Sequence, residues 1–436
     1  MTREPAAPRD GMGGSGSCSS ASRDLSSEAS TGLGSERELQ HLFERCVAPD
    51  LLAGAESASQ PVAMIVAGQP GAGLTYATIQ LRKQLIQTVT TAAHVSTHRL
   101  LAYHPLWAAG GDVTPNAAFA LSRLTQTWFD RMVDEIQKRR LNLVAEVETM
   151  DGTAVPKLAT QLRRNGYVVQ AVLIATNREE SRLAMMARYD MRRSAGLAAE
   201  QPSIPNHELA FDNVRALIAS LEERRTVDGL RIIDHAGAQI YESRLINGAL
   251  DREPQALTTL DAFMGRPRSP KELVQLAMRW ETLAQRLASD PAMPRDTASQ
   301  TVTWRNAAVA RCERDTVATQ MLQWAREAAM FRVMNRFEFE KEFPHLSRAV
   351  KSLGLAVIEA EKFGGEEGQR LLFHARENIA QRIERGDFPR ITAREKAMEE
   401  KALIKVQAQG RDGAVEPAPE PSRLARDLRE RDPPSR

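Results

Sequence analysis

The sequence predicts an α/β fold in which a parallel sheet is covered by helices on both faces, followed by a mainly α-helical C-terminal region. Apolar runs that are too short for helices alternate with amphipathic segments of helical period, and polar turn residues separate them. The runs are apolar along their whole length, which is typical of parallel strands buried on both faces. Beyond residue 262 only the helical spacing of apolar residues continues, which predicts the helical region.

The overall composition excludes several classes of protein. The 436 residues carry a formal net charge of +2, so no global charge favours a nucleic acid or an anionic membrane as a partner. The 3 cysteines are widely spaced and form no C-x-x-C pair, which favours a reduced compartment. No apolar run approaches the length of about 18 residues that a membrane span requires. We therefore expect a cytoplasmic protein with no nucleic-acid partner and no membrane partner.

Residues 1–36 differ in composition from the rest of the chain. They are rich in Ser, Gly and Pro and contain almost no large apolar side chains. Because such a segment cannot offset the entropy that it would lose on ordering, we expect a disordered leader. A second interpretation remains open, in which the leader is the transport signal of an injected, secreted bacterial effector.

Strands and helices are expected to alternate through residues 37–262, which we predict to form one domain. A capping serine and acidic groups in the first turn predict a helix that begins after Ser35. The apolar runs predict strands at residues 62–67, 92–96, 142–145, 168–175 and 229–234. The segments of helical period predict helices at about residues 73–88, 115–139, 154–165 and 179–194. Since ligands of parallel sheets bind at the carboxyl ends of the strands, we expect the functional site there.

The remainder of the chain is expected to contain three further segments. Glycine and proline predict a linker at residues 263–270, and the helical pattern predicts a helical domain at residues 271–390. Residues 391–436 have mixed charge and several prolines, which predicts a charged, largely disordered tail. The apolar stripes of the helical domain favour helices that pack on one another as a small bundle. A surface for a protein partner is the alternative.

The first predicted strand runs into a glycine-rich turn that opens a helix. The turn consists of Gly68, Gln69, Pro70, Gly71, Ala72, Gly73, Leu74 and Thr75. It fits the phosphate-binding pattern G-x-x-x-x-G-K-[ST] except that Leu74 stands in place of the lysine. In such a turn the backbone N–H groups and the positive end of the helix bind phosphate oxygens, and Thr75 stands where a hydroxyl ligates Mg²⁺. The turn predicts a P-loop kinase-like sheet that binds a nucleotide, and a plain tight turn is the alternative.

An ordered set of segments resembles the zeta toxin family. The set comprises the strand and turn from Pro61 to Thr75, His104-Pro105, Leu141 to Glu146, Arg188-Tyr189 and Arg231 to Gly237. The helix at residues 38–45 is similar to the start of the family, and the resemblance covers about residues 36–245. Zeta toxins are bacterial P-loop kinases of toxin–antitoxin modules. They phosphorylate the sugar 3′-hydroxyl of UDP-N-acetylglucosamine and so starve cell-wall synthesis.

The resemblance implies a set of ligands and site residues. It implies ATP or GTP with Mg²⁺ as cofactors, a UDP-sugar as substrate and an antitoxin as a partner. We expect an antitoxin or another protein partner to bind through the helical C-terminal region. By position, Gly68–Thr75 would bind the nucleotide, with Thr75 as the metal ligand. Glu146 would bind the substrate, and Arg188 would reach the phosphates.

The chain departs from the family at charged positions. Besides the lysine, the family has two aspartates after its second strand, and these positions are Ser96 and His98 here. The second aspartate is the family's base. A second arginine of the family falls near Gln201. His98 is a candidate replacement for the base, because imidazole exchanges protons near neutral pH, and a solvated loop histidine is the alternative.

Arg192 is a candidate for part of the lost positive charge. It lies four residues after Arg188 and therefore on the same helix face. Arg193 is a weaker candidate, and a solvated basic helix end is the alternative for both. Loss of one preorganised donor lowers a rate by about 10²–10³ and loss of a base by about 10²–10⁴. We therefore expect a nucleotide-binding phosphotransferase with impaired activity, with a non-catalytic binding or scaffold module and an injected effector as alternatives.

Overall fold

The computed structural model describes residues 34–89 and 91–389. Contacts along the chain group into two units. Unit 1 contains the residues up to Ser269 together with Arg279–Ala308, and unit 2 contains Pro270–Met278 and the residues from Val309 onward. This grouping divides the predicted helical domain of residues 271–390. The predicted tail at residues 391–436, and all of the predicted leader except residues 34–36, lie outside the described residues.

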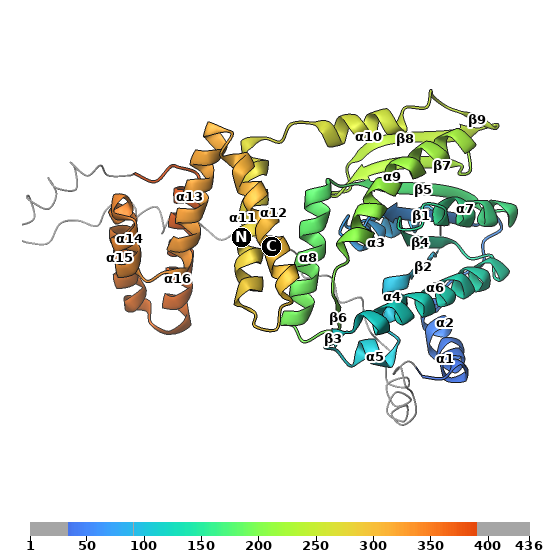
Figure 1. The fold of residues 1–436 in the computed structure, drawn as a ribbon, viewed down its shortest axis with the longest axis horizontal. Helices are drawn as coiled ribbons and strands as arrows, with labels where there is room; N and C mark the ends of the chain where they lie inside the picture. Colours follow the sequence, from blue (N-terminus) through green and yellow to red (C-terminus); the bar gives the residue numbers. More distant parts are fainter. Residues whose placement is uncertain (1–33, 90, 390–436) are drawn as a thin grey trace, which may run out of the picture. The chain divides into compact units, whose positions relative to one another are not determined.

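Unit 1 is built on a sheet of seven strands, and the predicted α/β fold is confirmed (Figure 1). In spatial order the strands are β2 (Ala93–Ser96), β4 (Leu143–Glu148), β1 (Val62–Gly68), β5 (Val168–Ala175), β7 (Gly229–Asp234), β8 (Gln239–Ile246) and β9 (Ala249–Leu250). The first five are parallel to one another, and β8 and β9 add an antiparallel edge that the sequence did not predict. A second, parallel pair joins β3 (Asp112–Val113) to β6 (Ala199–Glu200).

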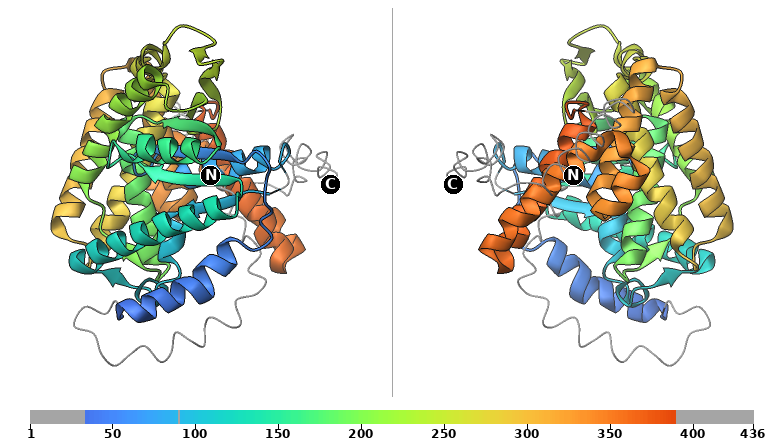
Figure 2. Two further views of the ribbon diagram at one scale, coloured as in Figure 1. Left: turned by 90° about the vertical axis from the view of Figure 1, so that its right-hand side faces the viewer. Right: turned by 90° about the vertical axis from the view of Figure 1, so that its left-hand side faces the viewer.

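Helices lie on both faces of this sheet, as Figure 2 shows. One face is covered by α3 (Leu74–Leu85), whose buried residues pack against strand residues such as Val66 and Val144. The other face carries the larger core, centred on side chains such as Trp128 and Met132. The helices that contribute to it include α6 (Pro115–Lys138), α7 (Ala154–Arg164), α9 (Ile204–Arg224) and α10 (Ala256–Gly265), with α1 (Glu36–Leu42), the π-turn Phe43–Val47 and α2 (Ala48–Leu51).

Shorter helices complete unit 1. They are α4 (Thr97–Leu101) and α5 (Pro105–Ala108). A longer helix, α8 (Arg178–Ser194), follows β5 and precedes β6. Helix α9 was missed by the sequence reading, although Ser203 caps its first turn and Ala210, Val214 and Leu217 are buried at helical spacing. None of the helices in the part of the chain that the structure describes is long and apolar enough to cross a membrane.

The remaining helices follow β9 and α10. Helix α11 (Pro270–Ser289) is shared between the two units, and α12 (Arg295–Cys312) lies mostly in unit 1. Unit 2 continues with α13 (Thr316–Val333), α14 (Arg336–Glu342), the 3₁₀ turn Pro344–Leu346, α15 (Ser347–Phe363) and α16 (Gly365–Glu384). Its core contains Phe331, Phe339 and Leu353, with Ile379 and Ile383 of α16. The side chains of these helices therefore pack on one another, as a small bundle requires.

The strand register places two carboxylates beside the glycine-rich turn. In the pairing of β1 with β4, Val66 lies opposite Glu146 and Gly68 lies opposite Glu148. Because side chains two residues apart on a strand point to the same face, Glu146 and Glu148 both project toward the face that α3 covers. The carboxyl ends of the strands therefore bring the turn and both carboxylates together.

Candidate functional site

The turn between β1 and α3 has the backbone that a phosphate cradle needs. Gly71 and Gly73 have φ angles of 80° and 93°, in the region that favours glycine. Gly73 is the N-cap of α3, and no side chain of the described residues caps the helix there. The first N–H groups of α3 are therefore directed at the position that an anion would take.

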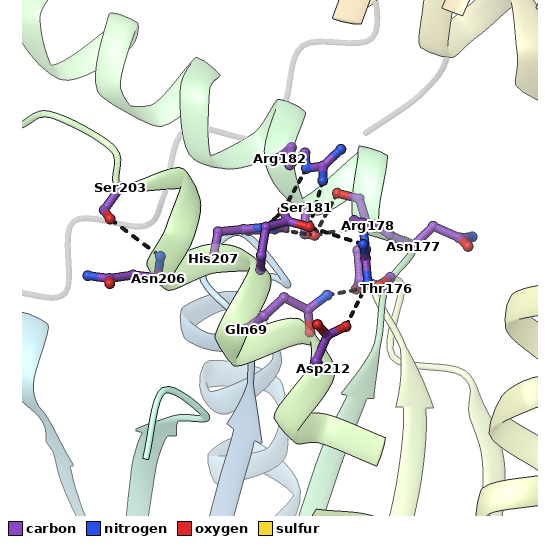
Figure 3. Close-up of polar contacts among 11 residues, drawn as sticks. Gln69, Thr176, Asn177, Arg178, Ser181, Arg182, Ser203, Asn206, His207 and Asp212 are labelled. Carbon is purple, nitrogen blue, oxygen red and sulfur yellow. Dashed lines mark hydrogen bonds and ion pairs between the residues drawn. The ribbon is translucent and has the colours of Figure 1, made fainter. Parts of the chain in front are cut away.

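Two buried polar contacts anchor the turn to the end of β5, and Figure 3 shows the one between Gln69 and Thr176. The Nε2 amide of Gln69 donates to the carbonyl of Thr176 at 2.8 Å, and the Thr176 hydroxyl donates to the carbonyl of Ala72 at 3.1 Å. Gln69 is only 1% exposed, so these bonds are shielded from solvent. Of the predicted nucleotide-binding residues, Gln69 and Ala72 thus serve to hold the turn in place.

A buried hydrogen-bond network lies behind the turn, where α8 meets α9 (Figure 3). Ser181 Oγ lies 2.8 Å from His207 Nε2, and His207 Nδ1 lies 2.8 Å from Glu208 Oε1. This order resembles a catalytic Ser–His–carboxylate triad. However, Ser181 and His207 are 0% exposed, so no substrate reaches them. Burial also lowers the pKa of His207 below its usual value, and the network serves to join the two helices.

The predicted metal ligand and the predicted substrate residue lie in contact. Thr75 Oγ1 donates to Glu146 Oε2 at 3.3 Å. The other oxygen of Glu146 lies 2.7 Å from His94 Nε2, and both partners are buried. His94 was not among the predicted site residues, although a single histidine in an otherwise apolar strand is a signal that could have revealed it. The structure therefore places a chain of three polar side chains under the turn.

Leu74 occupies the place of the lysine without replacing its function. It is 9% exposed and belongs to an apolar cluster with Met64, Val66 and Ala77. A Cβ on Gly68 would lie 3.7 Å from Leu74 Cδ2, so the leucine also reaches the start of the turn. The side chain of Leu74 therefore packs into the apolar core and supplies no charge to the turn.

His98 lies in α4, next to positive charge. Its half-buried ring meets the ring of Trp107 edge-on, with 6.2 Å between the ring centroids. Burial lowers the pKa of His98 to about 4, and the charges of Arg188 and Arg192 lower it as well, against the opposing effect of Glu146. The ring is therefore neutral at pH 7, and a proton acceptor with so low a pKa is weak.

The arginines of α8 have different environments. Arg188 is exposed to solvent. Arg192 donates from Nε to the carbonyl of Ala198 at 2.5 Å, and its guanidinium lies 5.1 Å from the centroid of the Trp107 ring. Arg193 pairs with Asp112 and Asp290 at 3.0 Å each. Arg188 thus remains available to a ligand, Arg192 is partly engaged, and Arg193 holds local structure.

The other substituted positions have structural partners. The hydroxyl of Ser96 caps α4 by accepting the N–H of Arg99 at 3.1 Å. Gln201 donates from Nε2 to the hydroxyl of Thr297 at 2.9 Å. Neither side chain supplies a charge to the turn.

Glu148 is a further acidic group at this edge that was not among the predicted site residues. Its side chain is exposed, but the surrounding protein raises the pKa of its carboxyl above the usual value. Arg188 lowers this pKa, whereas Glu200 and Glu146 raise it. A Glu-x-Glu pattern at the end of a strand was the signal in the sequence.

The arrangement suits the binding of a phosphorylated ligand. No group of three or more His, Cys, Asp or Glu side chains in the described ranges could hold a metal ion by itself. Mg²⁺ usually binds through one or two protein groups together with phosphates and water, and the hydroxyl of Thr75 at the start of α3 fits that role. A separate hollow of about 570 Å³ lies at the far end of α8 and is lined by Asp112, Asp190, Arg193 and neighbours. Of the candidate site residues named from the sequence, the weaker candidate Arg193 lines it, and His98, Arg188 and Arg192 do not.

Part of this chain is similar in sequence to proteins of the zeta toxin family. The zeta toxin family model matches residues 50–246. Toxin PezT of Streptococcus pneumoniae is 28% identical over 222 residues, which are 48% of this chain and 82% of that protein. Toxin zeta of Enterococcus hirae is 24% identical over 232 residues, which are 51% of this chain and 76% of that protein. A solved structure from the PezAT chromosomal toxin–antitoxin system of Streptococcus pneumoniae is 23% identical, with a TM-score of 0.46, over 57% of this chain and 97% of that chain.

Proposed function

Because residues 50–246 of this chain are a zeta toxin domain, we propose that it binds a nucleoside triphosphate, ATP or GTP, through Gly68–Thr75. We propose further that it transfers the terminal phosphoryl group to a hydroxyl of a sugar nucleotide such as UDP-N-acetylglucosamine. The observation that carries the proposal is the conformation of the turn, with two left-handed glycines that lead into an uncapped helix start. Thr75 would ligate Mg²⁺ between the phosphates, and Arg188 would approach them from α8.

The rate of this transfer is expected to be low. Phosphoryl transfer depends on positioning and on stabilisation of charge, and Leu74 supplies no charge. Removal of one preorganised donor costs about 10²–10³ in rate. Glu146 is proposed to bind the substrate, and because its oxygens contact Thr75 and His94, a substrate must compete with these partners.

Titration calorimetry with purified protein tests the proposal. ATP, GTP and UDP-N-acetylglucosamine are titrated separately in the presence of Mg²⁺, and release of ADP or GDP is then measured. We expect saturable nucleotide binding and slow turnover. The Leu74→Lys variant should gain about 10²–10³ in turnover, and Leu74→Met, which keeps an apolar side chain of similar size, should gain nothing. The proposal would be contradicted if neither ATP nor GTP bound.

A non-catalytic role of the same domain is the principal alternative. It rests on the apolar contacts of Leu74 and on the low pKa of His98, which leave two charged functions unfilled. Nucleotide binding without turnover in the starting protein, followed by turnover in the double variant Leu74→Lys with His98→Asp, would favour this role.

Unit 2 offers a surface for a protein partner such as an antitoxin. Of the 16 large hydrophobic side chains that are exposed among the described residues, 8 lie between Val317 and Phe373. Val333, Phe337 and Phe373 are 76%, 70% and 67% exposed. We expect a co-expressed antitoxin to co-purify with the protein and to be lost in the Phe337→Ser, Phe373→Ser variant. Co-purification that this variant leaves unchanged would refute the surface.

Delivery as an injected effector concerns the leader, which lies outside the described residues apart from residues 34–36. Deletion of residues 1–33 should then prevent delivery and leave nucleotide binding intact. Delivery that is unaffected by the deletion would exclude this role.

A further inference from the structure

We propose that Glu148 is the general base of this site, the group that accepts the proton of the attacking hydroxyl. The inference rests on the proposed phosphotransferase function. Ser96 and His98 stand where the zeta toxin family has two aspartates, so neither position supplies a carboxylate. Another side chain must then accept the proton.

The position of Glu148 follows from the sheet. It is the last residue of β4 and lies opposite Gly68, the first glycine of the turn. The N–H of Thr149 donates to the carbonyl of Gly68 at 3.1 Å, so the backbone next to Glu148 is joined to the turn. Its side chain points to the same face as Glu146, which contacts Thr75. Glu148 therefore stands at the open edge of the sheet, just beyond the phosphate cradle.

The other candidate bases near the turn are less suitable. Both oxygens of Glu146 are engaged, one by Thr75 and one by His94, and its side chain is buried. His98 is half-buried, and the charges of Arg188 and Arg192 oppose its protonation. By contrast, no hydrogen bond to the carboxylate of Glu148 is present within the described ranges, and solvent reaches it.

The charges around Glu148 suit a proton acceptor. The groups that act on it are Arg188 from α8, Glu200 from β6 and Glu146 from its own strand. Desolvation of the carboxyl by the surrounding protein raises the pKa of Glu148 above its usual value, Glu200 and Glu146 raise it as well, and Arg188 opposes the rise. Because its pKa is raised, the carboxylate of Glu148 binds a proton more strongly than an ordinary one, as a general base requires.

The proposed step balances as follows. The acceptor hydroxyl loses its proton to the Glu148 carboxylate while its oxygen forms a bond to the γ-phosphorus. The bond between that phosphorus and the β–γ bridging oxygen breaks, and the nucleoside diphosphate leaves with the electron pair. The protonated Glu148 then releases its proton to solvent, which restores the base.

The test compares Glu148→Gln with Glu200→Gln, which removes a neighbouring carboxylate away from the turn. ADP release from ATP is measured with Mg²⁺, with UDP-N-acetylglucosamine or water as acceptor, between pH 4.5 and 8. The measurements are made in the starting protein and in the Leu74→Lys background, where turnover is expected to be faster. Glu148→Gln should lower turnover by about 10²–10⁴ and remove the acid limb of the pH profile, with ATP affinity unchanged or tighter. Glu200→Gln should lower turnover less than about threefold and shift the acid limb to lower pH, since a like charge is removed.

Several results would overturn the inference. One is full turnover in Glu148→Gln, and another is an acid limb that persists in Glu148→Gln but disappears in His98→Gln. ATP binding without turnover in either background would also overturn it, and would leave nucleotide binding by the turn intact. Absence of ATP binding would instead overturn the proposed function and the inference with it.

Discussion

Replacement of Gly71 by alanine tests how closely the glycine-rich turn approaches α8. A Cβ at this position would lie 2.0 Å from the carbonyl oxygen of Ser181, whereas real Cβ contacts are longer than about 3.0 Å. The turn or the first turn of α8 must therefore shift by about 1 Å. The φ angle of 80° adds about 1–2 kcal/mol of backbone strain for any residue with a Cβ. Together, strain and overpacking should lower the free energy of unfolding by about 3–4 kcal/mol.

Gly73 provides the matched control for this prediction. Its φ angle is 93°, so alanine causes a similar backbone strain, but a Cβ there would meet nothing within 4 Å. Gly73→Ala should therefore lower the free energy of unfolding by only about 1–2 kcal/mol. Urea unfolding followed by circular dichroism measures both values, and hydrogen exchange of the start of α8 shows whether the disturbance spreads there from Gly71. Equal losses in the two variants would refute the close approach of the turn to Ser181.

Three further predictions concern buried charge. The pKa of His98 is about 4, below the usual 6.5, so the stabilisation that its neutral ring gives above pH 6.5 should be lost as pH falls toward 4. Urea unfolding at pH 6.5 and pH 4 should show a decrease in the free energy of unfolding on the order of 2 kcal/mol relative to the His98→Gln variant. His94→Ala should lower the free energy of unfolding by about 2–4 kcal/mol because it leaves Glu146 buried without its partner. Substitution of both residues by leucine should recover part of this loss. An unchanged free energy of unfolding in His94→Ala would contradict the pairing. In unit 2, Arg332→Met should lower the free energy of unfolding by about 1.5–3 kcal/mol because it removes the ion-pair partner of Glu377 and Glu384. Arg370→Met, which breaks an exposed ion pair, should lower it by less than about 0.5 kcal/mol. Equal losses in the two variants would show that burial of the ion pair is not decisive.

Much of the sheet could be predicted because its signals are local. The apolar runs of β1, β4, β5 and β7 and the glycines of the turn are contiguous in sequence, and the structure contains each of them. The antiparallel edge β8 was missed because its residues alternate in burial and carry charge, so they do not form an apolar run. Helix α9 was missed although its cap and apolar spacing were present in the sequence.

The candidate site was harder to predict because its contacts join distant segments. The turn at Gly68–Thr75 followed from its motif, whereas the roles of Glu146 and Arg188 were implied by the resemblance to the zeta toxin family. His98 stands where the resemblance placed a base, yet the arginines of α8 and its burial lower its pKa to about 4.

The sequence by itself determined that this chain has a glycine-rich strand-to-helix turn on a parallel sheet, with Leu74 where the phosphate-binding pattern has lysine. Short-range spacing and glycine content suffice for that, since they set the local backbone and the buried face. Only the tertiary structure decided which charges meet at the turn. His94 contacts Glu146 across 52 positions of the chain, and Glu148 lies opposite Gly68 through strand pairing. Such contacts depend on strand register and on helix packing, and no local pattern specifies them.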